Sequence, residues 1–175
     1  MLNWSPEKDK LRQLILYVAS RSANETRGDT FLNKMLFFSD AWALQHLGAP
    51  ITQSRYQKLP FGPASVNLMP VRQDMIEEGL VAVEMVGKTR VTRALREPDL
   101  SEFSTDEIKL VDEVFELFKG LSATRLSDIS HDLAPGWNLV GTKEDIPLHT
   151  QFLSTKPPPD SVLERGRELA ATHGW

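Results

Sequence analysis

The chain has 175 residues, of which 41% are hydrophobic and 25% charged, values typical of one globular domain that buries its own core. It has no cysteine, which excludes disulfides, thiolate catalysis, iron–sulfur clusters and cysteine zinc sites. The net charge is −4, with 13 Lys/Arg against 11 Asp/Glu in residues 1–100 and 7 against 13 in residues 101–175. A general phosphate-binding surface would be clearly basic, so this balance does not predict one.

No segment of the sequence predicts a signal peptide or a membrane span. Charged residues already occupy positions 7–10, and the densest apolar stretch, residues 35–38, ends at Ser39 and Asp40. A membrane-spanning helix needs about 20 apolar residues. We therefore expect a cytoplasmic protein that has no membrane partner.

Two helices are predicted in the N-terminal region. The first begins at Ser5 and Pro6, a capping residue and a proline suited to the first helical position, and ends near residue 22. The second is capped by Asp29 or Thr30 and ends near Gly48. Its apolar residues cover most of its circumference, which predicts a central, buried helix. A carboxylate on such a helix, Asp40, needs an internal partner or has a binding role.

The middle of the chain predicts an irregular connection, a helix and a hairpin. Residues 49–63 read as the connection, with a bend fixed by the prolines of PFGP at 60–63. A helical region follows to about residue 79, and Pro70 should kink it or begin it afresh. The valine-rich residues 80–86 and 89–95 predict a β-hairpin. A helix followed by a hairpin is also the order found in winged-helix modules.

Further helices are predicted in the C-terminal half. Ser104 and Glu107 form a capping box, and Ser122 caps another helix that ends near His131. Residues 132–160 look irregular and include three prolines at 157–159, which predict a stiff spacer before a last helix. We therefore expect a mainly α fold of about six helices with one β-hairpin after the third. Residues 1–150 would form the domain, and residues 151–175 a spacer and a helix that packs on it.

No strong catalytic motif is present, and no histidine has a second histidine three or four residues away. Asp128, His131 and Asp132 are close enough along one helix to suggest a metal site, and Ser127 with His131 suggests a nucleophile and its base. A histidine near a helix end that bonds a carbonyl or a carboxylate is the simpler interpretation. We expect no enzyme activity, no metal and no cofactor.

Two charged surfaces have both a functional and a structural interpretation. The β-hairpin carries basic residues that would contact phosphates in a winged helix, or would protect an exposed edge strand. These residues are Lys88, Arg90, Arg93 and Arg96, against Glu84 and Glu97. An acidic helix face is either solvated or a docking site for a basic partner. This face consists of Asp112, Glu113 and Glu116.

Three spaced motifs resemble one known family. Residues 31–40, FLNKMLFFSD, resemble the "KLNKLLYFAD" helix of the Panacea antitoxin domain, the SocA-like family. GAPIT at 48–52, Tyr56 and LPFGP at 59–63 are similar to its next segment, "GrPiT…Y…PYGPV". LSATRLSDISH at 121–131, followed by Trp137, resembles its "sa..Ls..sH…W" element. The match covers about residues 8–150, with phenylalanine at 37 and 61 where the family usually has tyrosine.

The resemblance implies a protein-binding function. Members of this family are bacterial antitoxins of two-gene toxin–antitoxin systems, some of them in prophages, and one branch is a proteolytic adaptor that delivers its toxin to a cytosolic ATP-dependent protease. It implies a cognate toxin as partner. We expect no specific nucleic-acid binding, because the net charge is −4 and the third predicted helix carries Asp74, Glu77 and Glu78 against Arg72 alone. The main alternative is a winged-helix-like DNA-binding regulator, and a third is a hydrolase or metal enzyme around His131. The family-motif residues, offered as candidate partner-binding residues, are Asn33, Lys34, Asp40, Tyr56, Pro60, Phe61, Gly62, Pro63, His131 and Trp137.

Overall fold

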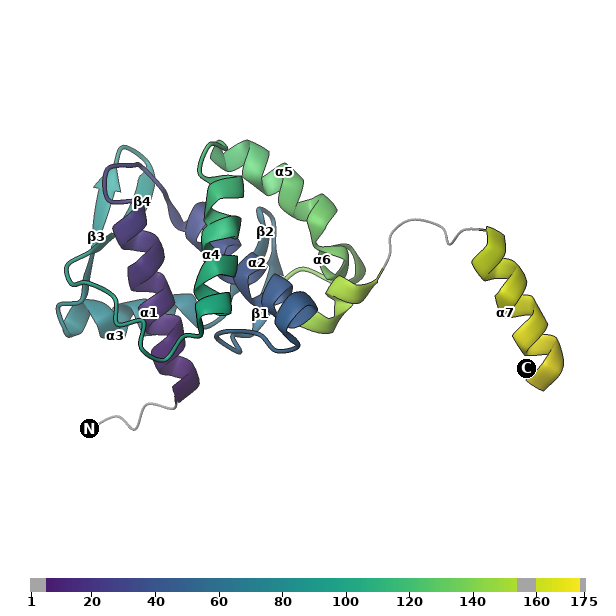
Figure 1. The fold of residues 1–175 in the computed structure, drawn as a ribbon. Coiled ribbons are helices and arrows are strands. Elements are labelled where there is room, and N and C mark those ends of the chain that lie inside the picture. Colours follow the sequence, from purple (N-terminus) through teal and green to yellow (C-terminus); the bar gives the residue numbers. More distant parts are fainter. Residues whose placement is uncertain (1–5, 154–159, 174–175) are drawn as a thin grey trace.

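The computed structural model describes residues 6–153 and 160–173 (Figure 1). Over these residues the chain forms seven α-helices, one short 3-10 helix and two antiparallel β-hairpins. The helices are α1 (Pro6–Arg21), α2 (Asp29–Leu47), α3 (Leu68–Glu77), α4 (Thr105–Phe118), α5 (Ala123–Leu133), α6 (Pro135–Leu139), η1 (Leu148–Phe152) and α7 (Asp160–His173). The strands are β1 (Tyr56–Leu59), β2 (Gly62–Ser65), β3 (Val81–Val86) and β4 (Thr89–Ala94). None of the described helices is long and apolar enough to cross a membrane.

The central element of the fold is α2, as its apolar circumference predicted. It packs against α1, α4, α5, β2, β4 and η1, and buried residues follow one another almost without a break from Phe31 to Ala43 (Figure 1). The ring of Phe31 packs edge-on against that of Phe115 in α4, with ring centroids 5.8 Å apart. The ring centroids of Phe38 and Phe118 are 5.2 Å apart. Since α2 is buried from Phe31 to Ala43, a polar side chain in this stretch needs a partner inside the protein.

The helix ends are mostly those that the sequence predicted. Ser104 and Glu107 form the capping box of α4, Ser122 caps α5 by accepting from the backbone of Arg125, and Gly48 ends α2 in the left-handed conformation at φ 85°. The cap predicted for α2 was wrong. Gly28 is its N-cap residue, and Asp29 lies in the first turn and pairs with the buried Arg72 of α3. The cap predicted for the first helix, Ser5, lies outside the described residues.

The largest correction concerns residues 49–63, which are not all irregular. Strands β1 and β2 form a hairpin with Tyr56 opposite Ser65 and Leu59 opposite Gly62. A third segment lies along the other side of β1, where the backbone of Ile146 donates to the carbonyl of Tyr56 at 2.7 Å. The strands are only four residues long, show no alternation of apolar residues and contain a proline, so the usual strand signals are missing.

Two other regions also differ from the prediction, whereas the second hairpin is confirmed. Helix α3 begins at Leu68, so Pro70 lies in its first turn, where a backbone N–H has no helical partner to lose, and no kink is needed. Residues 132–160 contain α6 and η1 and are therefore less irregular than predicted. Strands β3 and β4 pair from Val81–Ala94 to Val86–Thr89, directly after α3. The fold is thus mainly α with a hairpin after the third helix, plus a hairpin that was not predicted.

A last helix is present, as predicted, and runs from Asp160 to His173. Its apolar residues Val162, Leu163 and Leu169 are exposed, at 56%, 41% and 40%, and α7 lies apart from the other elements (Figure 1). The three prolines at 157–159 lie outside the described residues. Packing of this helix on the domain has no support in this structure and stays a prediction.

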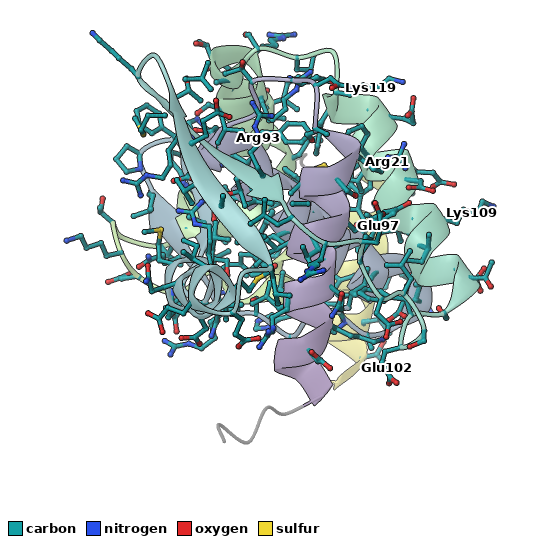
Figure 2. All side chains as sticks on the ribbon, turned by 90° about the vertical axis from the view of Figure 1, so that its left-hand side faces the viewer. Arg21, Arg93, Glu97, Glu102, Lys109 and Lys119 are labelled. Carbon is teal, nitrogen blue, oxygen red and sulfur yellow. The ribbon has the colours of Figure 1, made fainter. Side chains whose placement is uncertain are left out.

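The predicted acidic face of α4 is in part an internal contact. Arg21, at the end of α1, lies beside α4 (Figure 2). Its guanidinium pairs with Asp112 and Glu116 of that helix. The hydroxyl of Tyr17 also donates to Asp112 at 2.7 Å, while Glu113 is exposed. Two of the three acidic residues therefore fasten α1 to α4, so this face is not simply solvated.

Candidate functional site: the tip of the first hairpin and its supports

Asp40 is fully buried on α2 and holds the connection that leads into β1. Its carboxylate accepts hydrogen bonds from the Thr52 backbone N–H at 2.7 Å, from the Tyr56 hydroxyl at 2.8 Å and from the Thr52 hydroxyl. Burial raises the pKa of Asp40, and these three donors oppose that rise by stabilising the charged form. Burial, with the nearby Asp40 carboxylate, also raises the pKa of Tyr56 well above its usual value. The prediction that Asp40 has an internal partner is confirmed.

Lys34 lies on the same helix and holds the tip of the hairpin. Its side chain is 1% exposed, and its ammonium donates to the carbonyl oxygens of Phe61 and, at 3.2 Å, Pro63. No carboxylate lies within ion-pair distance of it among the residues that the structure describes. Burial without a counter-charge disfavours the charged form and lowers the pKa of Lys34 from 10.5 to about 7.

The other supports of the tip come from Asn33 and from Gly62. Asn33 accepts a hydrogen bond from the Ser65 backbone N–H at 2.9 Å and donates to the carbonyl of Asp29. Gly62 has φ 102°, and a Cβ at this position would collide with the Lys34 ammonium and the Ser130 hydroxyl. Only glycine therefore fits here.

The family-motif histidine and tryptophan support the same hairpin from α5 and α6. The rings of His131 and Trp137 stack with centroids 3.8 Å apart, and the Trp137 indole N–H donates to the carbonyl of Leu59 at 3.0 Å. The Lys58 ammonium lies 4.3 Å from the Trp137 ring centroid. The pKa of His131 is lowered by burial and by the charge of Lys34, although Asp128 and Asp132 act in the opposite direction.

The metal and nucleophile interpretations of His131 find no geometry to support them. Within residues 6–153 and 160–173, no three His, Asp or Glu side chains gather closely enough to hold a metal ion. Ser127 is buried on α5, and no described hydrogen bond joins its side chain to His131. His131 instead stacks on Trp137, so it serves the hairpin support described above.

The tip itself is exposed although its supports are buried. Phe61 is 69% exposed and Pro60 is also exposed, whereas Gly62 and Pro63 are buried. Beside the tip, a hollow of about 470 Å³ lies between the N-terminal half of α2, the hairpin and the start of α3. The sulfur-bearing side chain of Met69, 52% exposed, also lines it. The tip thus presents an aromatic ring on a firmly held backbone.

All ten family-motif residues named from the sequence lie in this hairpin or in its supports. The residues that sequence reasoning missed are the partners themselves: Thr52 for Asp40, Ser65 for Asn33, Ser130 beside Gly62 and Lys58 beside Trp137. These are ordinary surface residue types, and no local pattern singles them out. Their roles arise only when segments far apart in the sequence meet.

The basic hairpin is partly used for internal contacts. Arg93 pairs with Glu84 and donates to the carbonyls of Ala23 and Glu25, both at 2.9 Å, and Arg90 lies 3.7 Å from Asp29. Arg72, the one basic residue of α3, is 2% exposed and paired with Asp29. These contacts leave few cations on this face for phosphates.

These observations describe a mainly helical domain whose first hairpin has an exposed tip on a firmly supported backbone. The chain belongs to the SocA-like antitoxin family that carries the Panacea domain, because the family model "Antitoxin SocA-like, Panacea domain" matches residues 32–138. The match begins in α2 and ends in α6, so it includes Asn33, Lys34, Asp40, His131 and Trp137. No curated protein and no solved structure matches the chain.

Asp40→Ala should lower the free energy of unfolding by about 3 kcal/mol or more. The substitution leaves the buried hydroxyls of Thr52 and Tyr56 without their acceptor, and each stranded group costs about 1–3 kcal/mol. Urea unfolding followed by circular dichroism measures this loss. Glu113→Ala, an exposed carboxylate in the middle of α4, is the control and should change stability by about 0.5 kcal/mol or less. An unchanged stability for Asp40→Ala would show that Asp40 is not a structural tie.

The buried Lys34 should make stability depend on pH in a defined direction. Its pKa is about 7 in the folded chain and 10.5 in its ordinary environment, so between these values the unfolded chain binds more protons. Stability relative to Lys34→Met should therefore rise with pH through this window, by at most about 1.4 kcal/mol per pH unit. Urea unfolding at pH 7, 8 and 9 measures the difference, and Lys88→Met, an exposed control, should show no such trend. A difference that is constant with pH would contradict the lowered pKa.

Proposed function

We propose that this protein is the antitoxin of a two-gene toxin–antitoxin system and neutralises a cognate toxin by direct protein–protein contact. Membership of the Panacea antitoxin family supports the general role. Action by binding and not by catalysis, in the bacterial cytoplasm, is part of the same proposal.

The observation that carries this proposal is the exposed Phe61 on the supported hairpin tip. Aromatic side chains are enriched among the few residues that supply most of the binding energy at protein interfaces. A ring whose backbone is already fixed, here by Lys34 and Asn33, loses less conformational entropy when it binds. We therefore place the toxin-binding surface around Phe61 and Met69.

The resemblance also implies a second route for the same role, delivery of the toxin to a cytosolic ATP-dependent protease. The two routes differ in what happens to the toxin. Direct blocking leaves the amount of toxin in the cell unchanged, whereas delivery shortens its lifetime. Immunoblotting of a tagged toxin after protein synthesis is stopped separates them.

Co-expression with the product of the neighbouring gene should restore growth that this product alone prevents. Phe61→Ala should weaken binding by about 2 kcal/mol or more, roughly 30-fold, and so reduce rescue. Leu117→Ala on α4 removes a side chain of similar exposure, 53%, away from the tip and should leave rescue intact. A harmless neighbour, or a toxic one that is not neutralised, would contradict the antitoxin proposal. Equal rescue by both variants would contradict the placement of the surface at the tip.

The rival proposal of a DNA-binding regulator predicts a different result in a mobility-shift assay. We expect weak binding with no preference for the upstream promoter and a steep loss at about 150 mM salt. Arg93 is used in internal contacts and Arg90 lies 3.7 Å from Asp29, which leaves mainly Lys88 and Arg96 of this basic surface for phosphates. Helix α3 carries Asp74 and Glu77, and Glu78 is its C-cap residue, so this helix would repel phosphates. Nanomolar, promoter-specific binding that is lost in Lys88→Ala and Arg90→Ala would instead favour the regulator.

A further inference from the structure

The hollow beside the hairpin tip has a mainly apolar lining and a buried cation. Leu59, Phe61, Pro63 and Met69 line it from the hairpin and α3, and Lys34 lines it from α2. An ammonium has three N–H donors, and the carbonyls of Phe61 and Pro63 take two of those of Lys34. The positive charge thus lies next to a solvent-accessible hollow without a carboxylate partner in the described chain.

The other charges around the hollow do not cancel that of Lys34. Asp29 also lines it, but its carboxylate is already paired with Arg72 and lies 3.7 Å from Arg90. The start of α3 adds partial positive charge, since Asn67 makes no side-chain cap and Leu68 and Met69 of its first turn line the hollow. The hollow therefore has a positive charge at its base, and its walls are mainly apolar.

We propose that this hollow receives a carboxylate carried next to an apolar side chain, supplied by an acidic segment of the partner protein, and that Lys34 is its counter-charge. A buried charge that lacks an opposite charge is costly, and a carboxylate from the partner removes that cost on binding. The apolar walls favour a carboxylate on an apolar stem over a free phosphate, which is hydrated on all sides. The proposal rests on the proposed function, because it names the chemistry of the toxin segment that the tip would bind.

A pair of small molecules tests the proposal without the toxin. N-acetylphenylalanine has a carboxylate beside an aromatic ring, and N-acetylphenylalaninamide has the same shape without the charge. Each is titrated into the ¹⁵N-labelled full chain at pH 6.5, and shifts of the Gly62, Ser65 and Met69 amide signals are followed. We expect a Kd of about 1 mM for the acid and at least tenfold weaker binding of the amide. Inorganic phosphate should not shift these signals at the same concentration.

Two variants assign the preference to Lys34. Lys34→Met keeps an unbranched side chain but removes the charge, and should bind acid and amide alike. Lys88→Met on the second hairpin should keep the tenfold preference. Equal binding of acid and amide by the unaltered chain, no binding of either, a preference that survives Lys34→Met, or shifts with phosphate alone would each overturn the proposal. None of these outcomes depends on growth rescue, so the carboxylate proposal and the antitoxin proposal fail separately.

Discussion

The burial of α2 from Phe31 to Ala43 is the constraint on which the rest of the structure depends. A buried stretch of helix offers little solvent to its polar side chains, so Asn33, Lys34 and Asp40 need partners inside the protein. They find them at Thr52 in the connection after the helix, and in the hairpin that begins at Tyr56. The polar residues of the central helix therefore determine where the first hairpin lies, and the apolar ones form the core.

This arrangement joins stability to the proposed function. The contacts that satisfy α2 also fix the backbone around Phe61, and the stacked His131 and Trp137 hold the other side of the same hairpin through Leu59. An exposed ring on a fixed backbone is suited to binding a protein partner. Because Lys34 has only carbonyl partners here, the support itself retains a positive charge with which a partner can pair.

The sequence predicted the elements whose signals are local. The apolar circumference of α2, the capping box at Ser104 and the valine-rich second hairpin each depend on residues close together in the chain, and the structure agrees with all three. The first hairpin was missed because its short strands are stabilised by side chains of α2 and α6 and not by their own pattern. The internal partner of Asp40 was foreseen, but its identity as Thr52 and Tyr56 was not, because it depends on how distant segments meet.

Hydrogen exchange of the backbone amides tests most directly whether α2 holds the hairpin. The double variant Asn33→Ala with Lys34→Met removes both ties to the hairpin, and Thr30→Ala on the first turn of the same helix is its control. We predict that the amides of β1 and β2 lose protection by tenfold or more, about 1.4 kcal/mol, while those of α4 keep theirs. Unchanged protection of the hairpin, or an equal loss in β1, β2 and α4, would contradict the account.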